Sequence, residues 1–484
     1  MHISLSDVEP TSPVTGNLHT GYIWGIALVA ALGGFLFGYD WVVIGGAKPF
    51  YEVYFQLDSE RLIGWANSCA LIGCLIGALI AGEAGSRLGR KKVLIFSALL
   101  FAFSSIFTGW SHLFSIFILW RIAGGVAIGL ASNISPLYIA EISPAPWRGR
   151  LVSLNQLAIV CGILAAQIAN WLIAQKVPAQ SSAAVLSQSW NAQYGWRWMF
   201  TAVAVPAVVF FLLALVLPES PRWLAAKGKA DGARRVLARI GGQEYADLEL
   251  TAIENTLRQE TGEKLGWKDL LGKDVRKLFW IGIALAVLQQ WSGINILFNY
   301  AEEIYKSAGF GISDILFNIV ITGAINLIFT VIAMGFVDRA GRRRLMLLGC
   351  AGVALCHFAA GFAYRAGWHG SAVLVLTLCA IACYAMSLAP ITWVLISEIF
   401  PNRLRSLGVS ASVAGLWSAS FALTYSFPFL NRALTTAGAF FAYGAICLLG
   451  FVFVYRFVPE TRGKTLEEIE TSMTGDIKLL KDID

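Results

Sequence analysis

The chain has 484 residues, of which 57% are hydrophobic and only 14% are charged. An average soluble domain contains roughly 25% charged residues, so this composition excludes a water-solvated globule and indicates a protein of the lipid bilayer. The net charge of +7 comes with Lys and Arg residues that gather in short loops, and we therefore expect no nucleic-acid partner.

Twelve apolar segments are long enough to cross a bilayer. A hydrocarbon core about 30 Å thick needs about 20 residues at a helical rise of about 1.5 Å per residue. We predict an all-α membrane protein with transmembrane helices at 22–45, 62–84, 93–110, 114–138, 151–175, 198–217, 279–300, 315–337, 345–364, 371–396, 407–429 and 436–457. Because the number of spans is even, both termini lie on the same side.

Positive charge distinguishes the two sides of the membrane. Twelve Lys or Arg residues fall on one side, within the 22 residues of segments 86–92, 147–150, 339–344 and 402–406. Only seven fall in the loops of the other side, at 46–61, 110–113, 176–197, 301–312, 365–370 and 430–436. Since cytoplasmic loops carry the excess of Lys and Arg, we predict a multi-pass protein of the cell (inner) membrane with both termini in the cytoplasm.

A polar stretch separates spans six and seven. The segments PRWLAAKGKADGARRVLARI and LELTAIENTLRQE within it have the pattern of short amphipathic helices with mixed charges. We divide the chain into an N-terminal six-helix bundle (1–217), a cytoplasmic helical linker (218–278), a C-terminal six-helix bundle (279–457) and a cytoplasmic tail (458–484). The alternative for the linker is a small separate binding module.

Three sequence motifs occur twice, in the same order. GEAGSRLGRKK at 82–92 returns as GFVDRAGRRR at 335–344, YIAEISPAPWRGR with Glu141 returns as LISEIFPNRLRS with Glu398, and PESPRW at 218 returns as PETRGK at 459. Such a repeat indicates two related halves of six spans. This is the plan of transporters that bind their substrate between the halves, near the middle of the membrane.

The repeated motifs bring basic loop residues near acidic residues at the cytoplasmic ends of spans four and ten. We predict that these groups form charge clusters that latch the two halves together. The clusters contain Arg87, Arg90, Glu141, Arg148, Arg342, Arg343, Glu398 and Arg405. The simpler alternative is that the Arg residues only set the membrane topology, although this leaves the repeated acidic residues unexplained.

Asp40 and Arg121 are the two acidic or basic residues that lie well away from the ends of the predicted spans. Counting along the helices from Lys48 and His112 places both side chains about 12–14 Å below the outer face, so they can be neighbours. A charge at this depth usually marks an ion or substrate pathway. We favour a proton site over a structural salt bridge, because an aspartate that loses its arginine partner in a drier cavity takes up a proton.

Other functional classes find less support in the spans. His357 is the only histidine inside a span and has no acidic neighbour, which disfavours an intramembrane enzyme. The eight cysteines lie in apolar runs without metal-ligand spacing, so we expect neither a metal nor a cofactor. A membrane sensor that signals without transport would need a longer tail than 458–484.

Seven strings along the chain resemble the sugar porter family of the major facilitator superfamily. They are GGFLFGYDWVVIGG, GSRLGRKK, RIAGGVAIGLASNISPLYIAEISPAPWRGR, PESPRWL, QQWSGINILFNYAEEIY, GFVDRAGRRR and PETRGKTLEE. The resemblance covers nearly the whole chain and is strongest to the bacterial proton-coupled xylose transporters. It implies the two-bundle major facilitator fold and a sugar as the substrate.

The resemblance also implies roles for individual residues. Proton symporters of this family carry an acid at the position of Asp40, facilitators typically carry a neutral residue there, and Arg121 matches the arginine that pairs with the acid. The implied sugar-binding residues are Gln156, Gln289, Gln290, Asn295, Asn326 and Trp393. Amides donate to and accept from hydroxyls and Trp offers a flat apolar face, although a lone Gln in a span more often joins two helices.

Some neighbouring positions depart from the xylose transporters. Ile163 stands in place of a second Gln, Asn299 in place of an aromatic residue, Ala389 in place of a Gly and Leu416 in place of an amide. The residues expected to border the sugar site are these four together with Phe37, Tyr300 and Trp417. Because polar contacts are missing, the identity of the sugar stays open.

We therefore expect a monomeric secondary active transporter that imports a pentose or hexose by proton symport through alternating access. The alternative is a sugar uniporter without proton coupling. The expected partners are the sugar, the proton and the lipid bilayer, and no catalytic residue is expected.

Overall fold

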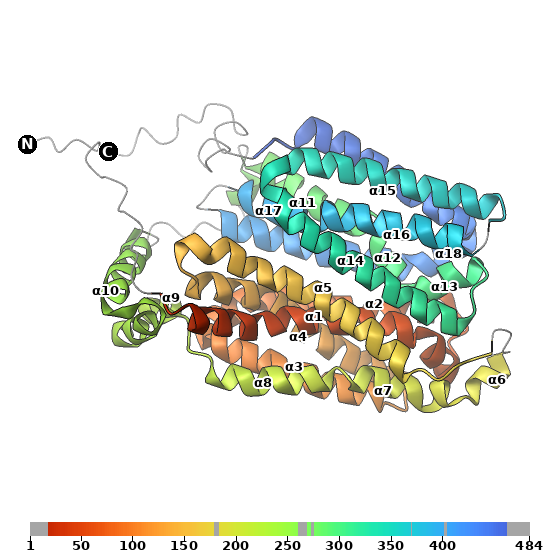
Figure 1. Ribbon diagram of the computed structural model, residues 1–484, viewed down its shortest axis with the longest axis horizontal. Helices are drawn as coiled ribbons and strands as arrows, with labels where there is room; N and C mark the ends of the chain where they lie inside the picture. Colours follow the sequence, from red (N-terminus) through yellow and green to blue (C-terminus); the bar gives the residue numbers. More distant parts are fainter. Residues whose placement is uncertain are drawn as a thin grey trace, which may run out of the picture.

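The computed structural model describes residues 18–178, 183–259, 269–272, 275–368, 370–400 and 404–461. Within these ranges, long apolar helices run side by side along one common direction (Figure 1). The N-terminal half contains α1 (Thr20–Phe55), α2 (Glu60–Leu88), α3 (Arg90–Gly109), α4 (Phe114–Ile142), α5 (Arg148–Ile173), α6 (Ala183–Ser187), α7 (Trp196–Thr201) and α8 (Ala204–Val216). A π-helical turn at Asn191–Gly195 leads into α7.

The C-terminal half contains α11 (Arg276–Trp291), α12 (Ile294–Asn299), α13 (Ala301–Ser307), α14 (Ile312–Ala340), α15 (Arg342–Arg365), α16 (Ser371–Met386), α17 (Leu388–Glu398) and α18 (Arg405–Phe457). Several predicted spans are thus built from two helices. Span seven is broken between α11 and α12, and span ten is broken between α16 and α17.

The described chain contains twelve spans, as predicted. Eleven helical segments are long and apolar enough to cross a membrane. One of them includes most of α18, whose 53 residues would extend about 80 Å as a straight helix, far more than a bilayer is thick. Non-helical backbone at Thr435 divides α18 into two spans.

Four helix pairs form the interface between the halves. α2 packs against α18, α5 packs against α14, and α1 packs against α12 and α13. Figure 1 shows the N-terminal half, red to yellow, lying along one side of the green-to-blue C-terminal half. The predicted fold of two six-helix bundles is confirmed, and it places α1, α5 and α12 next to the interface.

The three repeated motifs meet at one end of each half, which we call the basic end. Gly89 and Gly341 occupy equivalent turns with φ angles of 97° and 91°, conformations that favour glycine. At these turns the backbone N–H groups of Arg90 and Arg342 donate to the Glu219 and Glu460 carboxylates, each at 2.9 Å. The PES and PET motifs therefore cap the first turns of α3 and α15 in the same way.

Two further helices, α9 (Pro221–Ala226) and α10 (Ala230–Gln259), lie beyond the basic end (Figure 1). They fall within the predicted linker, and α10 is kinked at Gly241 and Gly242, where the backbone is non-helical. The N–H of His19 donates to the carbonyl of Ile240 at 2.8 Å, which attaches the start of α1 to α10. The linker helices are therefore packed onto the N-terminal half at this point.

Two predicted loops at the opposite end are helical, and those predictions were wrong. α1 continues through Pro49 to Phe55 instead of ending near residue 45, and α13 occupies Ala301–Ser307. Residues 42–51 of α1 are buried, because this part of the helix lies between α12 and α13 of the other half and helices of its own half, where Tyr51 packs against aromatic rings of α4 and α7. Lys48 can be buried because carboxylates pair with its ammonium group.

Candidate functional site

Asp40 on α1 and Arg121 on α4 form a buried ion pair between two helices of the N-terminal half. Arg121 Nη1 lies 3.1 Å from Asp40 Oδ1, and both residues are 3% exposed. The prediction that they are neighbours is confirmed. The guanidinium also lies over the Phe200 ring, 5.3 Å from its centroid.

The Asp40–Arg121 pair is not fully satisfied. Asp40 Oδ2 and Arg121 Nε have no hydrogen-bond partner among the residues that the structure describes. A Cβ placed on Gly124 would lie 3.2 Å from Asp40 Oδ2, so the glycine leaves room beside this oxygen. A buried carboxylate with one unpaired oxygen is costly as a purely structural device, and it is well suited to bind a proton.

The predicted amides of span seven meet at the break between α11 and α12. Gln289 and Gln290 lie at the end of α11, and Asn295 lies in α12. Asn295 Nδ2 donates to Gln290 Oε1, and Gln290 Nε2 donates to Gln289 Oε1 at 2.6 Å. Residue Gly293, with φ of 85°, produces the break that lets residues from both helices converge. The result is a buried cluster of three amides.

The remaining predicted sugar-binding residues lie on three other helices. Gln156 on α5 and Trp393 on α17 are partly buried, and Asn326 on α14 is 4% exposed. Among the residues that the structure describes, none of these three forms a hydrogen bond or a ring contact with the amide cluster. Their common role in sugar binding therefore stays a prediction.

Several of the expected neighbours lie where the two halves meet. The Phe37 ring of α1 lies 5.8 Å from the Trp417 ring of α18, centroid to centroid. Tyr300, between α12 and α13, donates its hydroxyl to the Thr424 carbonyl at 2.7 Å. The other expected neighbours are also buried, with exposed fractions of 2% to 9%: Ile163, Asn299, Ala389 and Leu416.

A cluster of charged residues at the opposite end was missed by the sequence reasoning. Lys48 on α1 is 1% exposed, and its ammonium pairs with Glu52 at 3.0 Å, with Glu302 at 3.4 Å and with Glu303. Since Glu302 and Glu303 belong to α13, these ion pairs join the two halves. Lys48 and Glu52 are four residues apart, a spacing that makes two side chains neighbours on a helix. This signal could not be used, because the segment was predicted to be a loop.

Two more contacts join the halves at the opposite end. Arg432 on α18 pairs with Glu60 on α2 at 2.5 Å. A Cβ placed on Gly45 of α1 would overlap the backbone carbonyl of Phe298 on α12, so the two helices touch there without an intervening side chain. The opposite end is therefore closed by charge pairs and by direct backbone packing.

The predicted charge clusters at the basic end form within each half. Arg90 pairs with Glu141 at 2.8 Å, joining α3 to α4, and Arg342 pairs with Glu398 at 3.6 Å, joining α15 to α17. Arg87 pairs with Glu83 of its own helix. The other three predicted residues donate to backbone carbonyls: Arg148 to that of Ala140 at 3.1 Å, Arg405 to that of Phe400 at 3.4 Å, and Arg343 to that of Tyr455. A latch between the halves stays a prediction.

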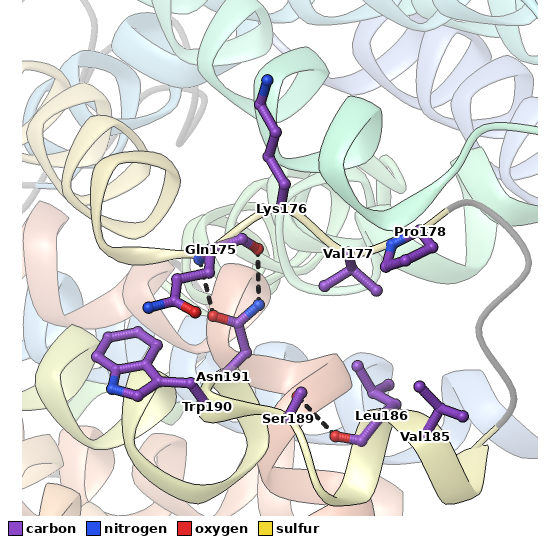
Figure 2. Close-up of a pocket in the computed structure, with 9 residues that line it drawn as sticks. All are labelled: Gln175, Lys176, Val177, Pro178, Val185, Leu186, Ser189, Trp190 and Asn191. Carbon is purple, nitrogen blue, oxygen red and sulfur yellow. Dashed lines mark hydrogen bonds between the residues drawn. The ribbon is translucent and has the colours of Figure 1, made fainter.

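A cavity of about 60 Å³ is separate from these residues. Figure 2 shows the residues that line it. The cavity lies at the opposite end, between the segment after α5 and the α6 region, where Asn191 exchanges two hydrogen bonds of 2.8 Å with the Gln175 backbone. Pockets that enclose small ligands have volumes of roughly 300 Å³ or more. This cavity is too small for a sugar.

The sequence matches the family model described as sugar (and other) transporter over residues 26–473. The D-xylose-proton symporter of Escherichia coli (strain K12) is 37% identical, with 95% of this chain and 97% of that protein covered. The arabinose-proton symporter of Bacillus subtilis (strain 168) is 39% identical, with 96% and 98% covered.

Solved structures of the xylose transporter XylE from E. coli have the same fold. A partially occluded inward open conformation superposes with a TM-score of 0.81 at 35% identity, covering 92% of this chain and all of that one. The proton:xylose symporter XylE bound to 6-bromo-6-deoxy-D-glucose gives a TM-score of 0.78 at 36% identity, covering 94% and 99%. Together with the family model, these matches show that this chain belongs to the sugar (and other) transporter family of the major facilitator superfamily.

Proposed function

We propose that this protein is a secondary active transporter that imports a monosaccharide, a pentose or a hexose, by proton symport through alternating access. The observation that carries the proposal is the buried Asp40–Arg121 pair with its unpaired carboxylate oxygen. Two relatives, a D-xylose-proton symporter and an arabinose-proton symporter, support the same activity. Sugar uniport without proton coupling is the alternative.

Asp40 is proposed to bind the coupled proton. When the carboxylate is ionised, it holds the Arg121 guanidinium at 3.1 Å, and α1 is tied to α4. A proton on Asp40 removes the charge that attracts Arg121, so the pair loosens and α1 gains freedom to move. Because α1 also packs against α12 and α13 of the other half, its movement is transmitted to the interface.

The amide cluster is proposed to bind the sugar. Gln289, Gln290 and Asn295 each offer a donor and an acceptor, which matches the hydroxyl groups of a sugar. In this structure their amides bond to one another, so an incoming sugar exchanges these bonds for bonds to its own hydroxyls. Gln156, Asn326 and Trp393 are proposed to complete the site from three other helices.

The closed opposite end indicates which state of the transport cycle this structure represents. If the basic end faces the cytoplasm, this structure is closed to the outside, in keeping with its likeness to the partially occluded inward open conformation of XylE. We propose that the protein works in the cell membrane as a monomer with its linker helices on the cytoplasmic side.

The test is sugar transport in reconstituted vesicles, with uptake driven only by a pH difference and, separately, counterflow without a gradient. We expect Asp40→Asn to abolish uphill uptake, because its amide cannot change charge, and to retain part of the counterflow. Arg121→Ala should slow both, because Asp40 then keeps its proton in a buried site. Asp58→Asn, the same exchange at an exposed position, is the control.

Uphill accumulation by Asp40→Asn would show that Asp40 is not the coupling site. A wild-type protein that equilibrates sugar but never concentrates it, and that causes no pH change when sugar is added, would establish uniport instead. A counterflow panel of pentoses and hexoses identifies the preferred sugar.

A further inference from the structure

The break between α11 and α12 leaves a backbone carbonyl without its usual helical partner. In a continuous helix the carbonyl of Ser292 would accept from the N–H of Ile296, but this N–H donates to the Gly293 carbonyl at 3.1 Å. A carbonyl left unpaired inside a membrane is strongly destabilising, because no water is present to replace the lost hydrogen bond. The break therefore needs a donor from elsewhere in the protein.

His357 on α15 supplies this donor. Its Nε2 lies 2.8 Å from the Ser292 carbonyl oxygen, and the residue is 1% exposed. Because a carbonyl only accepts hydrogen bonds, Nε2 carries the proton in this contact. The ring is fixed by aromatic neighbours on α18, with centroids 5.5 Å away at Phe440 and 6.2 Å away at Tyr443.

A second group of contacts fixes the break from the same side. The Cys447 thiol of α18 lies 3.6 Å from the Ser292 carbonyl, and a Cβ placed on Gly293 would lie 2.7 Å from the Tyr443 ring. On the other side, the Ser292 hydroxyl donates to the Gln289 carbonyl at 2.9 Å. Ser292 thus connects the histidine behind the break directly to the last turn that carries the amides.

We propose that His357 is a positioning residue for sugar binding, which acts by fixing the angle between α11 and α12. Gln289 and Gln290 precede the break and Asn295 follows it, so the angle determines whether these three amides converge on one ligand. The inference rests on the proposed function, because it assigns His357 to the sugar site formed by these amides. His357 itself does not touch the sugar.

The test compares three substitutions at this position. His357→Leu removes the donor and keeps similar bulk, His357→Gln can place its amide N–H near the position of Nε2, and His357→Asn is polar but too short. We expect the sugar affinity of the Leu and Asn variants to fall by roughly 5- to 50-fold, and that of the Gln variant to stay within about threefold of wild type. Binding and counterflow are measured on purified, reconstituted protein.

Two controls separate positioning from general stability. Thr377→Val removes a buried hydrogen bond of 3.1 Å to Tyr305 in the same half, away from the break. It should lower the melting temperature without changing sugar affinity. In an Asn295→Ala background, His357→Leu should weaken binding much less than in wild type, because both changes act on the same contact.

The results also distinguish failure of this inference from failure of the proposed function. A wild-type protein that binds no sugar overturns both. Normal sugar transport by the wild type with unchanged affinity in His357→Leu overturns the inference alone, as does a Gln variant no better than the Asn variant. If His357→Leu does not fold, the comparison of Gln with Asn decides.

Discussion

At the scale of single residues, the amide of Gln289 provides a direct measure of the sugar site. We predict that Gln289→Ala weakens sugar binding by about 1–3 kcal/mol, or roughly 5- to 150-fold, because it leaves buried hydroxyl groups and the Gln290 amide without a partner. Direct binding to the purified protein measures the effect. Gln175→Ala is the matched control, since the hydrogen bonds of Gln175 to Asn191 come from its backbone. Unchanged affinity in Gln289→Ala would remove this residue from the site.

Specificity is predicted to depend on two apolar residues. Ile163 and Leu416 are 5% and 2% exposed, at positions where the xylose transporters carry amides. A buried sugar hydroxyl without a partner costs about 1–3 kcal/mol, so these residues should disfavour sugars with a hydroxyl in their direction. We expect the double variant Ile163→Gln, Leu416→Gln to shift or broaden the sugar range in a counterflow panel. An identical profile would mean that the two side chains do not face the sugar.

Single residues also show how far the sequence could predict the site. Counting along two helices predicts that Asp40 and Arg121 are neighbours, and their ion pair confirms this, although Lys48, from which one count starts, lies buried inside α1. The sequence predicts Lys48 in the loop 46–61, whereas the structure places it inside α1. Its three carboxylate partners come from two helices, and two of them lie more than 250 positions away in the sequence, so their proximity could only follow from the fold.

At the scale of elements, the repeat predicted the plan of the helices and not their breaks. Apolar length indicated one span for α11 and α12 together, and one for α16 and α17 together, because hydropathy does not change where a helix bends. The break at Gly293 is visible only in the backbone, where φ is 85°. The cap of α3 by Glu219 and of α15 by Glu460 explains in physical terms why the PES and PET motifs recur.

At the scale of the whole molecule, the two halves must separate at the opposite end for the transport cycle to proceed. We predict that Lys48→Met favours the state in which this end is open, because Glu302 and Glu303 then lack a buried cation, and breaking a buried pair costs about 3–5 kcal/mol. Lys306→Met is the matched control. Lys306 lies 3.6 Å from Glu302, but its side chain is 68% exposed, so its loss should have little effect.

The distance between the halves measures this prediction. After the eight native cysteines are replaced, spin labels at His112→Cys and Ala366→Cys report on exposed loops of the two halves at the opposite end. Lys48→Met should increase the fraction of long distances relative to wild type and to Lys306→Met. Superimposable distance distributions in all three proteins would show that the ion pairs do not stabilise closure.

Closure at Gly45 has a consequence of another kind. The helix surface there is bare backbone, and it abuts the Phe298 carbonyl of the other half. A single additional methyl group on Gly45 would act as a wedge with no flexible neighbour to yield. The close fit that prevents leakage of protons and sugar therefore depends on the absence of a Cβ atom at Gly45. The charge pairs around Lys48, in contrast, determine the stability of the closed state.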